Sequence, residues 1–286
     1  MKDLKKRTIT AIVLIAIMIP VVYFGGIALE IVTALLAGLA AYELEHMFKK
    51  EDQWNFYGIF NIVLSIGSFF AFYYALMKSL PIIVLLFVVS LFIVQGFLMI
   101  FTKETNSYSL GNGLITIFYP SIGFSTLAFI RNIEIESLWH DGFFVLLYAV
   151  VICMMTDMFA YFFGCKFGKH KLCERISPNK SWEGSIAGTV FAVVFGTIFA
   201  YFTGVSEFLF HIESVVLSIT ITALLTLVLS VVDEIGDLFA SKLKRTYGIK
   251  DYSQIFPGHG GVLDRFDSYI FVSTALAFII LIISLF

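Results

Sequence analysis

The sequence predicts an all-α protein that crosses a membrane about nine times. Of its 286 residues, 59% are hydrophobic and only 14% are charged, whereas a soluble domain typically carries about 25% charged residues. The apolar residues come in long continuous runs, and a helix needs roughly 20 such residues to cross a bilayer. A net charge of −2 argues against a nucleic-acid partner. We therefore expect a polytopic integral membrane protein.

Nine apolar runs are each suited to form a membrane-spanning helix. The runs are residues 8–24, 27–42, 56–76, 80–101, 114–130, 143–163, 186–202, 214–232 and 268–286. Only Gly25 and Gly26 separate the first two runs, so these form either a tight hairpin or one broken element. We expect about five spans in residues 1–140 and about four in residues 141–286, without a separate soluble domain.

The positions of lysine and arginine predict the orientation. With nine spans, all but two of the 19 cations fall on the side that holds the N-terminus, the exceptions being Lys78 and Arg131. Cytoplasmic loops carry an excess of these residues. We therefore expect the protein in the cytoplasmic (cell) membrane with its N-terminus inside. A wrong number of spans would mix the two groups of cations, so the split also supports nine.

Two loops on that side differ from the others. Residues 164–182 and 233–267 together carry ten of the 19 cations and the densest set of carboxylates, glycines and histidines. Residues 141–286, which contain both loops, are therefore the expected catalytic region. The polar cavity that they form is expected to face the cytoplasm.

Two pairs of aspartates begin and end the second loop. Asp233 and Asp237 follow an apolar run directly, and they share one face if the helix continues outward. Asp264 and Asp267 are three residues apart and lead into the last run. Hard oxygen ligands of this kind suit Mg²⁺, which usually takes one or two carboxylates together with phosphate oxygens.

A glycine-rich turn and five cations lie around and between the two pairs. In the turn, residues 257–261, glycines let the backbone approach an anion and turn N–H groups toward it. The cations are Lys242, Lys244, Arg245, Lys250 and Arg265. Taken singly, the cations could be a topology signal, the glycines a turn and an acid pair a solvated helix end. Together they indicate metal-assisted phosphoryl or nucleotidyl transfer.

The sixth run and the first loop supply three more candidates. Asp157 lies within a span, where an ionisable group is costly and suggests a functional site, although a carboxylate at headgroup level is the alternative. In the first loop Ser181 can cap the following helix, with Glu183 in its first turn. This leaves Asn179 and Lys180 to face the same compartment as the second loop.

At these residues the sequence resembles the phosphatidate cytidylyltransferases. Their signature reads S-x-[apolar]-K-R, four residues, K-D, a spacer, [P/G]-x-H-G-G and then [apolar]-x-D-R-[apolar]-D, and every fixed position matches over the 27 residues from Ser241 to Asp267. One departure is Ala240, where many relatives carry an acid. The resemblance implies that CTP and phosphatidic acid are converted to CDP-diacylglycerol and pyrophosphate. It also implies a Mg²⁺-dependent two-cation site, whose second cation is not identified.

The resemblance implies a role for each matched residue. Asp237 and Asp264 become the leading metal ligands and, with Lys244, the catalytic set, while Asp233 and Asp267 are further ligands. The expected substrate-binding residues are Ser241, Arg245, Lys250, His259, Gly260, Gly261 and Arg265, joined by Asp157, Asn179 and Lys180 from the first loop. In this arrangement the turn cradles the triphosphate, and the two aspartate pairs converge at headgroup depth. Membrane lipids are further partners, and a homodimer is left open.

Two other functions remain as alternatives. A membrane kinase that uses CTP to phosphorylate a long-chain prenol would release CDP and no pyrophosphate. A transporter could use Asp157 as its coupling site, but it predicts broken helices and charge near the midplane. Here the charges collect at one membrane face, which favours the cytidylyltransferase.

Overall fold

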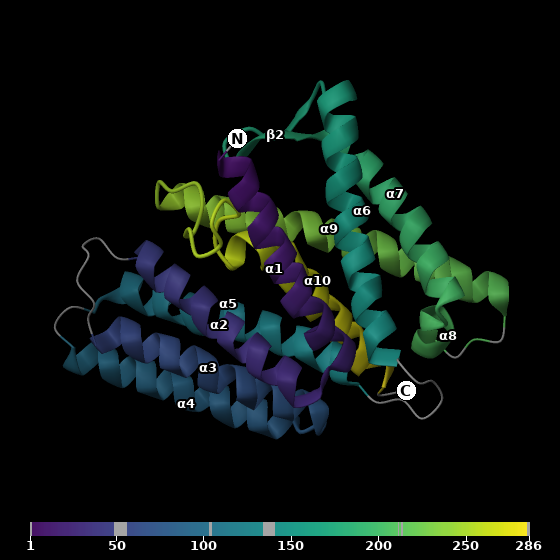
Figure 1. Cartoon of the computed structure of the whole chain (residues 1–286). Coiled ribbons are helices and arrows are strands. Elements are labelled where there is room, and N and C mark those ends of the chain that lie inside the picture. The colour runs from purple at the N-terminus through teal and green to yellow at the C-terminus, as the bar shows by residue number, and fades with distance from the viewer. Residues whose placement is uncertain are drawn as a thin grey trace. The chain divides into compact units, whose positions relative to one another are not determined.

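The computed structural model describes residues 2–48, 56–102, 105–133, 141–210, 212 and 214–284 (Figure 1). Within these residues, eight helices are long and apolar enough to cross a membrane, and residues 12–24 form a shorter apolar helical segment. Within the described residues each of the nine predicted runs overlaps a separate helix, which confirms the all-α polytopic prediction.

The nine helices that contain the predicted runs are, in order, α1 (Lys2–Phe24), α2 (Gly26–Phe48), α3 (Phe56–Met77), α4 (Pro81–Phe101), α5 (Ser107–Asn132), α6 (Asp141–Phe167), α7 (Trp182–Phe202), α9 (Val215–Thr246) and α10 (Leu263–Ile283). The first two runs form two separate helices joined at Gly25. Gly25 and Gly26 have φ angles of 62° and 60°, a conformation that residues with a side chain rarely adopt. A further short helix, α8 (Val205–Phe210), was not predicted because six residues leave no periodic pattern to detect.

The chain divides into two compact units. Unit 1 comprises Met1–Phe129 and Tyr247–Arg265, and unit 2 comprises Ile130–Thr246 and Phe266–Phe286. The segment after α9 therefore belongs to unit 1, although the helices on either side of it belong mostly to unit 2. We describe each unit separately.

Unit 1 has a buried chain of polar side chains from three helices. Asn61 Nδ2 donates to Glu45 Oε1 at 2.9 Å, Gln95 Nε2 donates to Asn61 Oδ1 at 2.8 Å, and Tyr57 OH donates to Gln95 Oε1 at 2.7 Å. All four residues are buried. In lipid no water is available to satisfy polar groups, so such groups must pair within the protein. This chain of bonds links α2, α3 and α4.

Unit 2 is built on close contact between α6 and α7. Every fourth residue on one face of α7 is small and buried: Gly184, Gly188, Ala192, Gly196 and Ala200. A β-carbon on Gly188 would lie 2.5 Å from the carbonyl oxygen of Thr156, so the two backbones approach as closely as glycine permits. The hydroxyls of Thr156 and Ser230, 2.8 Å apart, link α6 to α9.

A two-stranded antiparallel hairpin, β1 (Lys171–Cys173) and β2 (Ser177–Ser181), connects α6 to α7 (Figure 1). We expect a loop over residues 164–182 from the sequence, and the hairpin within it was not predicted. The hairpin is fastened to α7 by Glu183, whose carboxylate accepts from the backbone N–H groups of Lys169 and His170 at 3.1 and 3.2 Å. Glu183 thus holds the hairpin, with strand β2, against the start of α7.

The predicted cap of α7 is confirmed. The Ser181 hydroxyl accepts from the backbone N–H of Gly184 at 3.2 Å, and Glu183 lies in the first turn. A serine at this position satisfies one of the otherwise unpaired N–H groups of the first turn. The cap places Ser181 and the residues before it directly at the N-terminus of the helix.

Candidate active site

Three carboxylates lie in one helical stretch of unit 2. Helix α9 continues without a break from its apolar part to Thr246. The prediction that Asp233 and Asp237 share one face depended on this continuation. Asp233 and Asp237 are therefore one turn apart, and Glu234 follows Asp233 directly. Asp233 and Glu234 are both buried.

Helix α10 brings a fourth carboxylate to this stretch. A β-carbon on Gly236 would lie 3.0 Å from Phe271 Cβ and 3.1 Å from the carbonyl oxygen of Asp267, so α9 and α10 touch at this point. The Ser268 hydroxyl also donates to the carbonyl oxygen of Asp233 at 3.2 Å. This packing places Asp267 beside the carboxylates of α9, and the charges of Asp237 and Lys244 both act on it.

A lysine from the hairpin enters this acidic group. Lys180 Nζ lies 2.7 Å from Asp237 Oδ2, and the Ser241 hydroxyl donates to Asp237 Oδ1 at 3.3 Å. Burial would lower the pKa of Lys180, but the charge and hydrogen bond of Asp237, with the charges of Glu234 and Asp157, outweigh it and raise the pKa above its usual value. Lys180 therefore stays positively charged at neutral pH.

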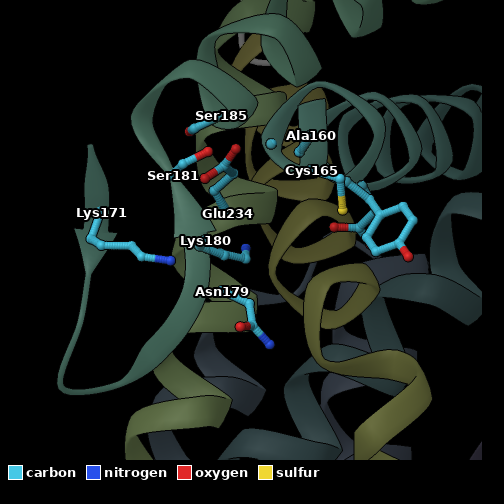
Figure 2. A pocket seen from close by; sticks show the side chains of 11 residues that line it. Ala160, Cys165, Lys171, Asn179, Lys180, Ser181, Ser185 and Glu234 are labelled. Atoms are coloured by element: carbon cyan, nitrogen blue, oxygen red, sulfur yellow. The ribbon is translucent and has the colours of Figure 1, made fainter. Parts of the chain in front are cut away.

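A cavity of about 490 Å³ opens beside this lysine. It is lined by Asp157, Ala160, Tyr161, Gly164, Cys165, Lys171, Asn179, Lys180, Ser181, Ser185 and Glu234. In Figure 2 the Lys171 side chain extends from the hairpin toward Lys180, and Cys165 lines another part of the wall. The structure thus brings together the three candidates of the sixth span and first loop, which are Asp157, Asn179 and Lys180.

Sequence reasoning missed two charged residues of this cavity wall. Glu234 stands next to Asp233 in the sequence, and this neighbouring acid was the signal that could have found it. Lys171 lies opposite Ser181 in the hairpin. It was not predictable, because its position depends on strand pairing that the sequence does not indicate.

The carboxylates of unit 2 have the chemistry of a cation site. Both side-chain oxygens of Asp233 and Oε1 of Glu234 are buried without a hydrogen-bond partner among the described residues. Within these residues no group of three or more histidine, cysteine or acidic side chains is close enough to form a closed metal cage. Mg²⁺ does not require one, because it usually takes one or two carboxylates and completes its shell with water and phosphate. The residues present therefore fit this ion.

The glycine-rich turn lies in unit 1 and is closed by its own hydrogen bonds. The backbone N–H of His259 donates to the carbonyl oxygen of Phe256 at 2.8 Å, and that of Phe256 donates to Gly260 at 2.9 Å. Arg265 Nε donates to the carbonyl oxygen of His259 at 2.6 Å. Gly260 has a φ of 87°, which explains the need for glycine at this position.

Asp264 also belongs to unit 1, whereas the other carboxylates named above belong to unit 2. Its Oδ2 accepts from the backbone N–H groups of Tyr252 and Gly261 at 2.8 and 2.9 Å. These bonds make Asp264 a structural part of the loop, in addition to any role as a ligand.

The predicted residues are therefore distributed over the two units. Unit 2 holds Asp157, Asn179, Lys180, Asp233, Asp237, Ser241, Lys244, Arg245 and Asp267, and unit 1 holds Lys250, His259, Gly260, Gly261, Asp264 and Arg265. Sequence reasoning also missed Glu43 of α2, a fully buried acid that contacts the loop of unit 1. The signal available was a carboxylate in the last two turns of a mostly apolar helix.

The fold and this site define a class: a polytopic membrane protein with a cavity that is lined by two carboxylates and two lysines, one of them partly buried. The model of the cytidylyltransferase family matches residues 5–283. A phosphatidate cytidylyltransferase of Bacillus subtilis is 33% identical over 285 residues, which cover 99% of this chain and 100% of that protein. One of Staphylococcus haemolyticus is 32% identical over 276 residues, covering 94% and 96%. The chain belongs to the cytidylyltransferase family.

Proposed function

We propose that this protein is a phosphatidate cytidylyltransferase, which transfers CMP from CTP to phosphatidic acid and yields CDP-diacylglycerol and pyrophosphate. Membership of the family, and relatives of that name that match over nearly the full length, support this activity. The observation that carries the proposal is the position of Lys180 at the cavity, 2.7 Å from Asp237. A charged lysine among carboxylates gives both a phosphate ligand and cation ligands in one place.

In the proposed reaction an oxygen of the lipid phosphate attacks the α-phosphorus of CTP. A new P–O bond forms as the bond to the bridging oxygen breaks, and pyrophosphate leaves with that electron pair. A phosphomonoester already carries about −1.5 to −2 charges at neutral pH, so the step needs no strong base. Both reactants are anions, and the contribution of the protein is to bind them in line and to reduce their repulsion.

The side chains of the cavity have separate tasks in this proposal. Lys180 and Lys171 bind phosphate oxygens, and Asn179 orients the nucleotide through its amide. Asp157 and Glu234 hold the positive charge of Lys180 in place, since both raise its pKa. Lys244 and Arg245 at the end of α9 add further positive charge. Bound anions thus meet fixed cations without the reorganisation that water would need.

Mg²⁺ would be held by one or two of the carboxylates of Asp233, Asp237 and Asp267, with water and phosphate oxygens completing its shell. The family signature adds Asp264 as a further predicted ligand. When bound, it supplies positive charge that neutralises the phosphates and the leaving group. A second, unidentified cation remains part of the proposal. The buried carboxylate oxygens of Asp233, which have no hydrogen-bond partner in the described part of the chain, support cation binding at this place.

The proposal includes a location. The lipid substrate stays in the bilayer, so the cavity would face the cytoplasm at headgroup depth, where irregular backbone is tolerable if it lines a cavity. The excess of lysine and arginine on one side of the predicted topology supports this orientation in the cell membrane.

One assay tests the proposal and separates it from its rivals. Purified protein in detergent is incubated with labelled CTP and phosphatidic acid, with and without Mg²⁺, and pyrophosphate and CDP are both measured. We expect CDP-diacylglycerol and equimolar pyrophosphate only with Mg²⁺. In a parallel reaction with a long-chain prenol in place of phosphatidic acid, release of CDP from CTP together with prenyl phosphate, without pyrophosphate, would instead identify a kinase. Absence of any nucleotide turnover in both reactions would contradict both enzymes.

A further inference from the structure

The start of α10 is held by a carboxylate from a distant helix. Glu43 of α2 is 0% exposed, and its Oε1 accepts from the backbone N–H of Val262 at 2.8 Å while its Oε2 accepts from that of Leu263 at 2.9 Å. The first N–H groups of a helix have no partner within the helix and need an acceptor. Glu43 supplies this acceptor from another part of unit 1.

The same carboxylate also holds the opposite end of the loop. The Ser253 hydroxyl donates to Glu43 Oε1 at 2.5 Å, and the same hydroxyl accepts from the backbone N–H of Ile255 at 3.2 Å. Asp264 bridges the loop in a similar way through Tyr252 and Gly261. Two carboxylates therefore tie residues 252–253 to residues 261–263.

Glycine at position 261 is explained by this contact. A β-carbon on Gly261 would lie 2.7 Å from Glu43 Cδ and 2.8 Å from Oε2, so any side chain would expel the carboxylate. The N–H of Gly261 itself donates to Asp264. The anion that the backbone approaches at Gly261 is thus a side chain of the protein.

We infer that Glu43 is a positioning residue for the reaction, and this inference rests on the proposed function. By fixing residues 252–263 it sets the conformation of the segment that carries His259, Asp264 and Arg265, three residues of the family signature. Glu43 touches no substrate in this account. A neutral amide cannot replace it, because glutamine offers one acceptor oxygen and turns an N–H₂ group toward a backbone N–H.

The test compares Glu43→Gln with Glu30→Gln. Glu30 lies on the same helix, about 20 Å from Glu43 at 1.5 Å per residue, and accepts from the hydroxyls of Tyr73 and Tyr74. Both variants are purified, checked for a monodisperse peak, and assayed for kcat and for KM of CTP. Limited trypsin cleavage after Lys250 and Arg265, read by mass spectrometry, reports the loop independently of activity.

We expect Glu43→Gln to lower kcat at least tenfold, to change KM for CTP less than threefold, and to speed cleavage after Lys250. Glu30→Gln should match the wild type in all three. If the wild type itself makes no CDP-diacylglycerol, the proposed function fails, and cleavage still reports on the loop. If the wild type is active and Glu43→Gln keeps its kcat, the inference is overturned, even if cleavage is faster.

A variant that removes only one bond covers the case in which Glu43→Gln does not fold. Ser253→Ala takes away one of the three donors and leaves Glu43 in place. We then expect a threefold to tenfold loss of kcat with faster cleavage. Wild-type kcat in Ser253→Ala would overturn the inference in that case.

Discussion

Lys180 and Asp237 form an ion pair of 2.7 Å between strand β2 and helix α9. The pair is partly buried, with 21% and 29% of the two side chains exposed. Because the hairpin is fastened to α7 and α9 packs against the same helix, neither partner is free to move far from the other. The lysine is therefore held next to the acids at the cavity, where a phosphate would need it.

Removing the charge of Lys180 should reduce activity strongly. In Lys180→Met we expect kcat to fall by about 10²–10³-fold, the effect typical of losing one preorganised donor to a developing charge. Lys166→Gln is a suitable control, because Lys166 is exposed at the end of α6 and lines no part of the cavity. Loss of activity in the control variant to the same degree would contradict a specific role for Lys180.

The pH dependence of this loss follows from the raised pKa of Lys180. A group whose pKa is higher in the folded than in the unfolded protein stabilises the fold fully when the pH is below the unfolded-state pKa. This stabilisation is lost only as the pH rises through the folded-state pKa. Lys180 therefore keeps its charge from pH 6 to pH 9. The ratio of wild-type to Lys180→Met activity should be constant over this range, and a ratio that falls between pH 7 and pH 9 would contradict it.

Asp237→Asn should abolish product formation while the protein remains folded. The substitution keeps the shape of the side chain but removes the charge that would bind a cation and that pairs with Lys180. Glu207→Gln, which alters an exposed acid of α8 outside the family signature, serves as the control. Radiolabelled CDP-diacylglycerol is measured, and near-normal activity of Asp237→Asn would remove this residue from the cation site.

Removal of Mg²⁺ should stop turnover reversibly. We expect no CDP-diacylglycerol in excess chelator and full recovery when Mg²⁺ is restored. The carboxylates of unit 2 outnumber the lysines near them, so a bound cation is needed to offset their negative charge and that of the phosphates. Binding of Mn²⁺ as a paramagnetic probe, followed without substrate, gives a second readout. Full activity in excess chelator would exclude the metal.

The contact between α6 and α7 predicts a difference between two glycines. Gly188→Ala should destabilise the protein by about 1–3 kcal/mol, because the added methyl group meets Thr156 and Ala160. The methyl group added by Gly67→Ala in α3 meets no atom of the described residues within 4 Å, so this variant should stabilise the protein by about 0.5–1 kcal/mol through helix propensity. The midpoints of thermal unfolding in detergent should shift in opposite directions.

The helices were predictable because lipid imposes a simple rule on composition. Each apolar run became a helix, and α9 carried Asp233 and Asp237 on successive turns because the helix continued past its apolar part. The position of Lys180 at the start of α7 followed from the cap at Ser181. These features are determined by residues that are close together in the sequence, so a sequence pattern can predict them.

The partners of the carboxylates were not predictable, because they depend on tertiary contacts. Glu43 and Val262 are 219 residues apart, and nothing near either one indicates the other. Gly261 lies against Glu43, a contact that the sequence does not indicate, while its part in a phosphate cradle stays a prediction.

The bond between Glu43 and the start of α10 has a consequence for biosynthesis. The ribosome makes α2 early, and at 5–20 residues per second about 10–40 s pass before the chain reaches Val262. During this time the carboxylate of Glu43 has none of its three final donors. A newly inserted α2 must therefore stay hydrated at that end, or be protected by the insertion machinery, until nearly all the other helices have entered the bilayer.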